Sequence, residues 1–179
     1  MHATAAAVFE PLDDAVLLQA PAPGKWSAAQ CLEHLNAYSR FYLPAMEKAI
    51  RAAGPQQRRP AAVFKSGILG NYFTNMMQPR LEGTIGMRMQ SPRSYRPETT
   101  LPAAEVVAAF IAHQHKIIQL LQQAAQVNLQ AVKVPTTLGS WLKFSLGDTF
   151  RFILAHEQRH LLQARRALAA ETTGRLALE

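Results

Sequence analysis

The chain has 179 residues, of which 49% are hydrophobic and 17% are charged, and its net charge at pH 7 is +7. This length suits a single domain (residues 1–179), and the hydrophobic content excludes a chain that is disordered throughout. No apolar stretch reaches the ~20 residues of a transmembrane helix, so we expect no membrane partner. The single cysteine, Cys31, excludes an internal disulfide. Together with the lack of an evident secretory signal, it favours a cytoplasmic location.

The basic residues are scattered along the chain, for example at Arg58, Arg59 and Arg151. A nucleic-acid-binding surface usually gathers its basic residues on one face or interleaves them with aromatic residues. We therefore interpret the positive charge as a solvated surface. A phosphate-binding face is the less favoured alternative, and nucleic acid is not an expected partner.

The elements predicted along the first part of the chain are helices. A short helix is expected over about 3–19. Ser27 and Gln30 form a capping box, in which each side chain satisfies a backbone amide of the other residue, and this box starts a long helix over about 27–53. Pro44 removes a backbone donor inside this helix and predicts a kink or a split.

Three further helices are expected from the apolar periodicity, at about 62–80, 100–128 and 145–171. Ser145, followed three residues later by Asp148, marks the start of the last one. No alternation of polar and apolar residues predicts a strand, so the expected fold class is all-α. The connection over 81–97 is too long for a tight turn, and connections of this length are often functional or cross over between distant helices.

Three histidines are expected to face the interior. His156 and His160 are four residues apart, so on a helix they lie one turn apart on the same face. A helical wheel places both at one margin of the apolar face of the last helix, and places His34 at the edge of the apolar face of the 27–53 helix. Inward side chains on facing helices are a common way to build a ligand site in a bundle.

Three imidazoles would bind a divalent metal ion and leave one position of a tetrahedral site open, as in catalytic zinc sites. Each histidine taken alone is more simply a hydrogen-bonded core residue, but the combination of the three favours the metal site. His113, at the edge of another apolar face, is a less favoured fourth contact. Cys31, one turn before His34, is more simply a small buried hydrophobe than a thiolate ligand.

Glu157 gives the late run the pattern H-E-x-x-H, in which the glutamate of zinc peptidases is the general base. The 19 residues after His160 contain no histidine, and no sheet is predicted, so a peptidase is disfavoured. Glu157 lies inside the apolar face of its helix. We expect it to orient a ligand or to satisfy a buried donor, and a role as a base that acts on water is the alternative.

Three further residues are candidates for substrate binding. Tyr38 and Tyr42 lie on the apolar face of the 27–53 helix, where they are most simply core aromatics, with hydroxyls near the open metal position as the alternative. Arg88 lies in the 81–97 connection. This connection is most simply an exposed crossover, and the alternative is a lid whose arginines meet an anionic substrate.

Two segments resemble a known family. Residues 24–35 read G-K-W-S-A-A-Q-C-L-E-H-L, and residues 155–164 read A-H-E-Q-R-H-L-L-Q-A. Together they resemble the DinB/YfiT-like superfamily, in which a W-S-x-x-[EQ] helix start precedes the first histidine ligand and a late H-x-x-x-H supplies the other two. The matching positions are His34, His156 and His160.

The resemblance implies a four-helix bundle of the DinB/YfiT type, with a long crossover connection between the second and third main helices. It also implies a divalent metal ion, commonly zinc or nickel, and frequent homodimers. Some members of the family are metal-dependent hydrolases, and others are transferases or isomerases that use small thiols such as bacillithiol or mycothiol. Others have no established activity.

The preferred hypothesis is a metal-dependent thiol S-transferase that joins a low-molecular-weight thiol to a small-molecule electrophile. A bound metal ion lowers the pKa of a thiol or of water and so supplies a nucleophile at neutral pH. Hydrolysis, with water as the nucleophile, is the first alternative. The second is a stress-linked binding protein without enzymatic activity, whose metal site is structural or vestigial.

Overall fold

A computed structural model describes residues 2–80 and 90–176 of the chain. The helices are α1 (His2–Phe9), α2 (Asp14–Leu18), α3 (Ala28–Arg51), α4 (Ile68–Met77), α5 (Ala103–Ala124) and α6 (Leu146–Leu176), with a short 3-10 helix, η1 (Arg93–Tyr95). Two antiparallel strands, β1 (Lys133–Thr136) and β2 (Gly139–Ser145), form a small sheet. The fold is therefore mostly helical, as predicted, but the expectation of no strand is wrong.

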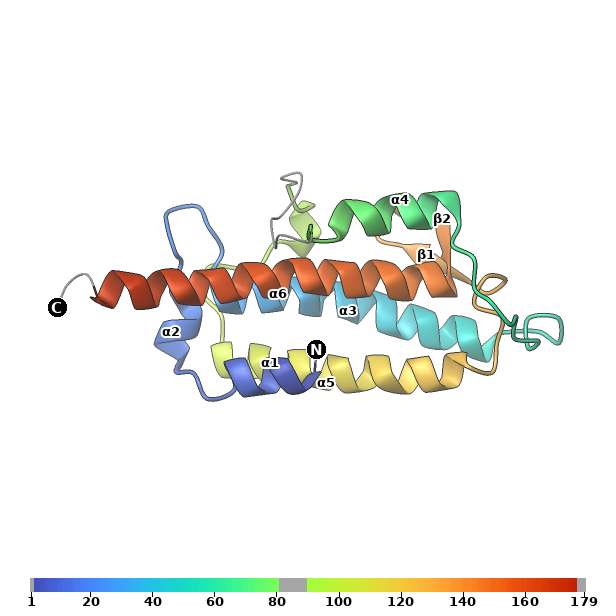
Figure 1. The fold of residues 1–179 in the computed structure, drawn as a ribbon, viewed down its shortest axis with the longest axis horizontal. Coiled ribbons are helices and arrows are strands. Elements are labelled where there is room, and N and C mark those ends of the chain that lie inside the picture. Colours follow the sequence, from blue (N-terminus) through green and yellow to red (C-terminus); the bar gives the residue numbers. More distant parts are fainter. Residues whose placement is uncertain (1, 81–89, 177–179) are drawn as a thin grey trace.

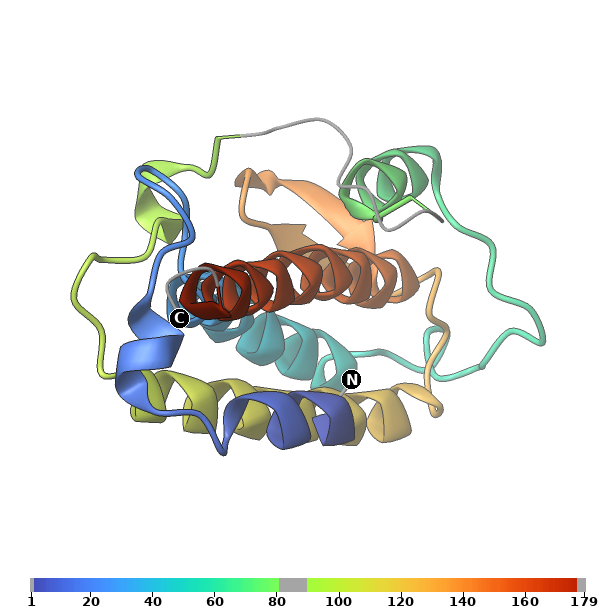
Figure 2. The same ribbon diagram turned by 60° about the vertical axis from the view of Figure 1, so that its left-hand side comes forward.

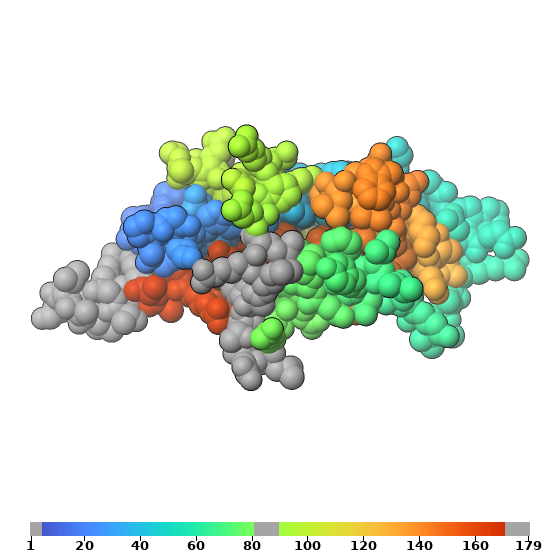
Figure 3. Space-filling model, turned by 90° about the horizontal axis from the view of Figure 1, so that it is seen from above, coloured from blue at the N-terminus to red at the C-terminus, as the bar shows by residue number. Residues whose placement is uncertain are grey.

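Helix α6 runs along the molecule and contacts most of the other elements (Figure 1). Helix α3 packs against both α5 and α6, while α4 packs against α6 and contacts β2. Helix α1 lies alongside α5, on the side of the molecule opposite the sheet (Figure 2). In the space-filling view, α4, the sheet and the segment that contains η1 share one face (Figure 3).

Two clusters of buried apolar side chains hold these elements together. One lies between α3, α5, α6 and the sheet, and it includes Tyr42, Leu120 and Val134. The other joins α1 and α2 to α3 and α5, and it includes Phe9 and Leu32. Burying one large apolar side chain stabilises a fold by about 1.5–3 kcal/mol. Because α3 contributes to both clusters, its position is well fixed.

The predicted start of α3 is confirmed. Ser27 Oγ accepts a hydrogen bond from the Gln30 backbone N–H at 3.2 Å, and Gln30 Oε1 accepts one from the Ser27 backbone N–H at 3.0 Å. The predicted possibility of a split at Pro44 is wrong, because α3 continues through this residue. A proline removes only one backbone donor, and the buried neighbours Leu43 and Met46 hold both sides of it in the same core.

The predicted start of α6 is also confirmed, since Ser145 Oγ accepts a hydrogen bond from the Asp148 backbone N–H at 3.1 Å. The Asp148 carboxylate accepts further hydrogen bonds from the Ser145 hydroxyl at 2.7 Å, the Gly67 backbone N–H at 3.0 Å and the Ser66 hydroxyl. A Cβ on Gly70 would lie 2.2 Å from Asp148 Cγ. Glycine at this position therefore lets α4 approach the start of α6.

The other elements differ from the predicted bounds. The helix expected over 3–19 is divided into α1 and α2, because Pro11 lies between them. The helix expected over 62–80 is shorter and begins only at Ile68. The sheet was not predicted because its strands are short, and because Pro135 and Gly139 are residues typical of loops.

The 81–97 connection is described only from residue 90. Within the described part, η1 is followed by Arg96, whose Nε donates a hydrogen bond to the Ser91 carbonyl at 2.8 Å. Arg88, a predicted substrate contact, lies outside the described residues. In the part of the chain that the structure describes, no helix is both long and apolar enough to cross a membrane.

Candidate metal centre

The structure brings the three predicted histidines together in the interior. His34 lies on α3, while His156 and His160 lie one turn apart on α6, which packs against α3. Their exposed fractions are only 2%, 4% and 8%, respectively. The distances between the three ring centroids are 4.5–5.0 Å. The sequence placed these side chains at the margins of two apolar faces, and the packing of α3 on α6 makes the margins meet.

The spacing of the imidazole nitrogens fits a metal ion. His34 Nε2 lies 3.2 Å from His156 Nε2, and one ring nitrogen of each histidine lies within 4.8 Å of the others. Zinc–nitrogen bonds of about 2.0–2.1 Å at tetrahedral angles put two ligand nitrogens about 3.3 Å apart. The His34–His156 pair already has this separation.

Hydrogen bonds orient two of the three imidazoles. His34 Nδ1 donates to the backbone carbonyl of Tyr95 at 2.6 Å, and His160 Nδ1 donates to Gln163 Oε1 at 3.1 Å. A carbonyl oxygen can only accept, so the proton of each neutral ring resides on Nδ1. The Nε2 lone pairs then remain available for a metal ion, as is usual for histidine ligands.

Burial keeps these imidazoles neutral. Desolvation lowers the pKa of His34, lowers the pKa of His160 to about 3, and lowers the pKa of His156 well below its ordinary 6.5. The nearby charge of Arg159 lowers the pKa values of His156 and His160 further. Neutral imidazole is the form that binds metal ions, so no proton has to leave these side chains at neutral pH.

Within the described residues, these three histidines form the group of His, Cys, Asp and Glu side chains that is placed to hold a metal ion. The model of the DinB superfamily matches residues 1–164 of the chain. The chain belongs to the DinB superfamily. This confirms the resemblance expected from residues 24–35 and 155–164. A comparison with the curated proteins finds no match, and neither does a comparison with the solved structures.

Aromatic rings surround the three histidines of this DinB-superfamily protein. The Trp26 and Tyr38 ring centroids lie 4.9 and 5.0 Å from that of His34. Phe152 stacks on His156, with 5.8 Å between the ring centroids and 18° between the ring planes. These rings make the surroundings of the histidines largely apolar, which accounts for the strong desolvation of their imidazoles.

The two tyrosines predicted to bind substrate take different positions. The Tyr38 ring centroid lies 4.5 Å from that of His156, so this ring contacts the histidine group directly. The Tyr42 ring is buried one turn away, and its hydroxyl accepts a hydrogen bond from the Thr137 backbone N–H at 3.3 Å. Substrate binding by Tyr38 and Tyr42 stays a prediction.

The Glu157 carboxylate lies against α5. Its Oε1 accepts a hydrogen bond from Gln114 Nε2 at 2.7 Å, and its Oε2 is buried without a hydrogen-bond partner among the described residues. Burial raises the pKa of Glu157 from 4.5 to about 7, although the bond from Gln114 lowers it in part. This contact favours the interpretation that Glu157 satisfies a buried donor. A catalytic role for it stays a prediction.

The two extra ligands considered from the sequence do not join the three-histidine group. His113 Nδ1 donates to Asn36 Oδ1 at 2.9 Å, in a contact between α5 and α3. Cys31 is fully buried in the core, as the simpler interpretation predicted. Burial raises the pKa of its thiol to about 12, which opposes formation of a thiolate ligand.

Sequence reasoning missed four residues that contact or orient the histidines, namely Trp26, Tyr95, Phe152 and Gln163. For two of them, the sequence separation from a histidine indicates the contact. Phe152 lies four residues before His156, and Gln163 lies three residues after His160, so each shares a helix face with its histidine. Tyr95 had no such signal, because it uses its backbone carbonyl.

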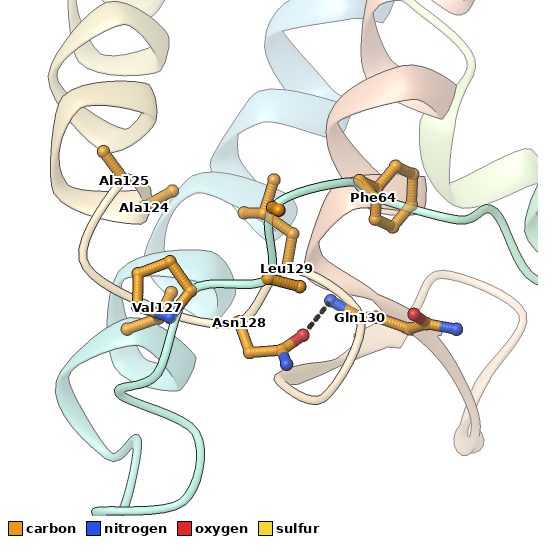
Figure 4. A pocket seen from close by; sticks show the side chains of 10 residues that line it. Phe64, Ala124, Ala125, Val127, Asn128, Leu129 and Gln130 are labelled. Carbon is orange, nitrogen blue, oxygen red and sulfur yellow. Dashed lines mark hydrogen bonds between the residues drawn. The ribbon is translucent and has the colours of Figure 1, made fainter.

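A separate cavity of about 250 Å³ lies where α5 ends, beside the segment that leads to α4 (Figure 4). Its lining is mostly apolar and includes Phe64, Val127 and Leu129. One of its polar side chains, that of Asn128, is held by the local backbone, since Asn128 Oδ1 accepts a hydrogen bond from the Gln130 backbone N–H at 3.0 Å. The three histidines do not line this cavity, so it is not part of the candidate metal centre.

Proposed function

We propose that this protein is a metal-dependent enzyme that binds one divalent ion, zinc or nickel, through His34, His156 and His160. The observation that carries the proposal is the convergence of three buried, neutral imidazoles with a 3.2 Å separation between two of their Nε2 atoms. The bound ion would lower the pKa of a small thiol or of water and so supply a nucleophile at neutral pH.

The chain's own residues orient the ligands and limit the access of water. The Tyr95 carbonyl holds the His34 ring, and the Gln163 side chain holds the His160 ring. The rings of Trp26 and Tyr38 give the centre an apolar border. An apolar border favours an organic nucleophile and an organic electrophile over bulk water. The preferred reaction is therefore transfer of a low-molecular-weight thiol to a small-molecule electrophile.

Hydrolysis is the second candidate function, and the composition of the ligand group favours it. The group holds three imidazoles and no thiolate or carboxylate. Three histidines around zinc are a known arrangement for activating water. The two candidates share the same metal ligands and differ only in the nucleophile.

The finer features of the fold belong to the same proposal. Helices α3, α4, α5 and α6 would form the four-helix bundle of the superfamily, with the connection between α4 and α5 as its crossover. The contacts of α3 with α5 and α6, and of α4 with α6, support this arrangement. A homodimer in the cytoplasm is the expected state of the protein, with a small molecule as its substrate.

Titration of the cobalt-loaded protein with 2-mercaptoethanol tests the thiol. We expect a thiolate-to-cobalt charge-transfer absorption that grows to saturation, because the thiol is the proposed nucleophile. The double variant His156→Ala, His160→Ala should lack this absorption, and His113→Ala, which changes a histidine outside the group, should retain it. Bound cobalt without the charge-transfer absorption would exclude the thiol and favour hydrolysis.

A further inference from the structure

Residues that carry hydroxyl groups lie next to one another on three separate elements, and one of them, Tyr38, contacts the histidines. The Tyr38 ring centroid, on α3, lies 4.5 Å from that of Tyr95 on η1, and it stacks with Tyr42 at 6.3 Å. Tyr42 Oη lies 3.4 Å from Thr137 Oγ1, in the turn between β1 and β2. The chain has four tyrosines, and the fourth, Tyr72, is exposed on α4.

The hydrogen bonds leave a donor in this group. Tyr42 Oη accepts from the Thr137 backbone N–H at 3.3 Å, and a phenol oxygen that accepts a bond still has its own O–H to donate. Thr137 Oγ1, at 3.4 Å, is farther away than the usual 2.5–3.0 Å of a bond between two hydroxyls. The hydroxyl proton of Tyr42 is therefore better placed for a hydrogen bond to an acceptor atom of a bound ligand than for one to Thr137.

The hydroxyls of this group suit an oxygen acceptor with negative charge. Tyrosine hydroxyls are protonated at neutral pH and can donate hydrogen bonds, and burial raises the pKa of Tyr42 further. Hydroxyl donors stabilise negative charge on a nearby oxygen atom.

We propose that Tyr38, Tyr42, Tyr95 and Thr137 form a hydroxyl pocket that binds the oxygen of a carbonyl or carboxylate group of the substrate. This inference rests on the proposed function and names its substrate class, which is a small molecule with a flat apolar body and a carbonyl at or beside its electrophilic carbon. The flat body suits the aromatic rings at the centre, such as Trp26.

The pocket would act during the addition step. The lone pair of the nucleophile forms a bond to the electrophilic carbon, and the π pair of the C=O group moves onto its oxygen, directly or through a conjugated C=C bond. The tyrosine hydroxyls donate hydrogen bonds to this oxygen while it is negative. The proton that the thiol or water lost to solvent is later returned to the product, so that charge and atoms balance.

Acetate and azide binding to the cobalt-loaded protein test the pocket, with dissociation constants taken from the change in cobalt absorption. Acetate carries the carboxylate that the pocket would recognise, whereas azide binds metal ions without any oxygen atom. Tyr42→Phe and Tyr95→Phe should each weaken acetate binding by about tenfold or more, since a hydrogen bond to a charged group is lost. Azide affinity should change by less than about twofold.

Tyr72→Phe and Thr137→Ser are the controls for a general loss of structure. Tyr72→Phe removes a hydroxyl from an exposed position and should leave acetate affinity unchanged. Thr137→Val should weaken acetate binding, whereas Thr137→Ser should preserve it.

Equal acetate affinity in the wild type and in all three variants Tyr38→Phe, Tyr42→Phe and Tyr95→Phe overturns the pocket but not the metal centre. Equal weakening of acetate and azide also overturns the pocket. If the wild type binds no cobalt, the proposed function fails and the inference fails with it.

Discussion

Zinc should raise the free energy of unfolding of the chelator-stripped protein by about 2.7 kcal/mol when its free concentration is 100 times its dissociation constant. The reason is that the ligands meet only in the folded chain, where His34 lies 122 positions from His156 in the sequence. Urea unfolding at a series of free zinc concentrations measures this increment. The variant His156→Ala, His160→Ala retains one imidazole of the three and should show no increment.

His113→Ala is the matched control, because its imidazole lies on α5, which packs against α3, but bonds to Asn36. This variant should lose some stability with and without zinc, and it should keep the full zinc-dependent increment. A zinc increment of equal size in the double variant would place the ion elsewhere in the chain and contradict the three-histidine centre.

Replacing Glu157 with Gln should make the stability of the metal-free protein less dependent on pH. Burial raises the pKa of Glu157 in the folded state to about 7, from 4.5 in the unfolded state. The folded state therefore holds this proton more tightly, and stability falls as the pH rises from 4.5 to about 7, then stays at the lower level. Between pH 4.5 and 8, the stability of Glu157→Gln relative to the wild type should rise by roughly 2–3 kcal/mol.

Replacing Gln114 with Leu should make the stability of the metal-free protein more dependent on pH. The Gln114 side chain donates the hydrogen bond that partly lowers the pKa of Glu157, so its loss should raise that pKa further. Chemical unfolding at several pH values should then show a steeper loss of stability toward alkaline pH. If the wild type and the Glu157→Gln variant have parallel pH profiles, folding does not raise the pKa of this carboxylate.

The helix starts were predictable because their signals are local. The capping bonds of Ser27 and Ser145 reach only three residues along the chain, so the residue types and their spacing are sufficient to identify them. The start of α4 depends instead on a distant partner, since the Gly67 backbone N–H donates to Asp148, 81 positions away. No local pattern around Gly67 contains this information.

The grouping of the histidines was predictable for a similar reason. A spacing of four residues puts His156 and His160 on one face of a helix, and the apolar margins of two helices are the places that pack together. The surroundings of the group were less predictable. Tyr95 orients His34 with its backbone carbonyl, a group that every residue has, and Thr137 reaches Tyr42 from a sheet that the sequence did not predict.

Elemental analysis of the protein, purified without a nickel column, tests the metal centre most directly. The wild type should carry about one equivalent of zinc or nickel per chain, since three histidines hold a single ion. The variant His156→Ala, His160→Ala, purified in parallel, should carry almost none. Equally low metal contents in the two proteins would contradict the account.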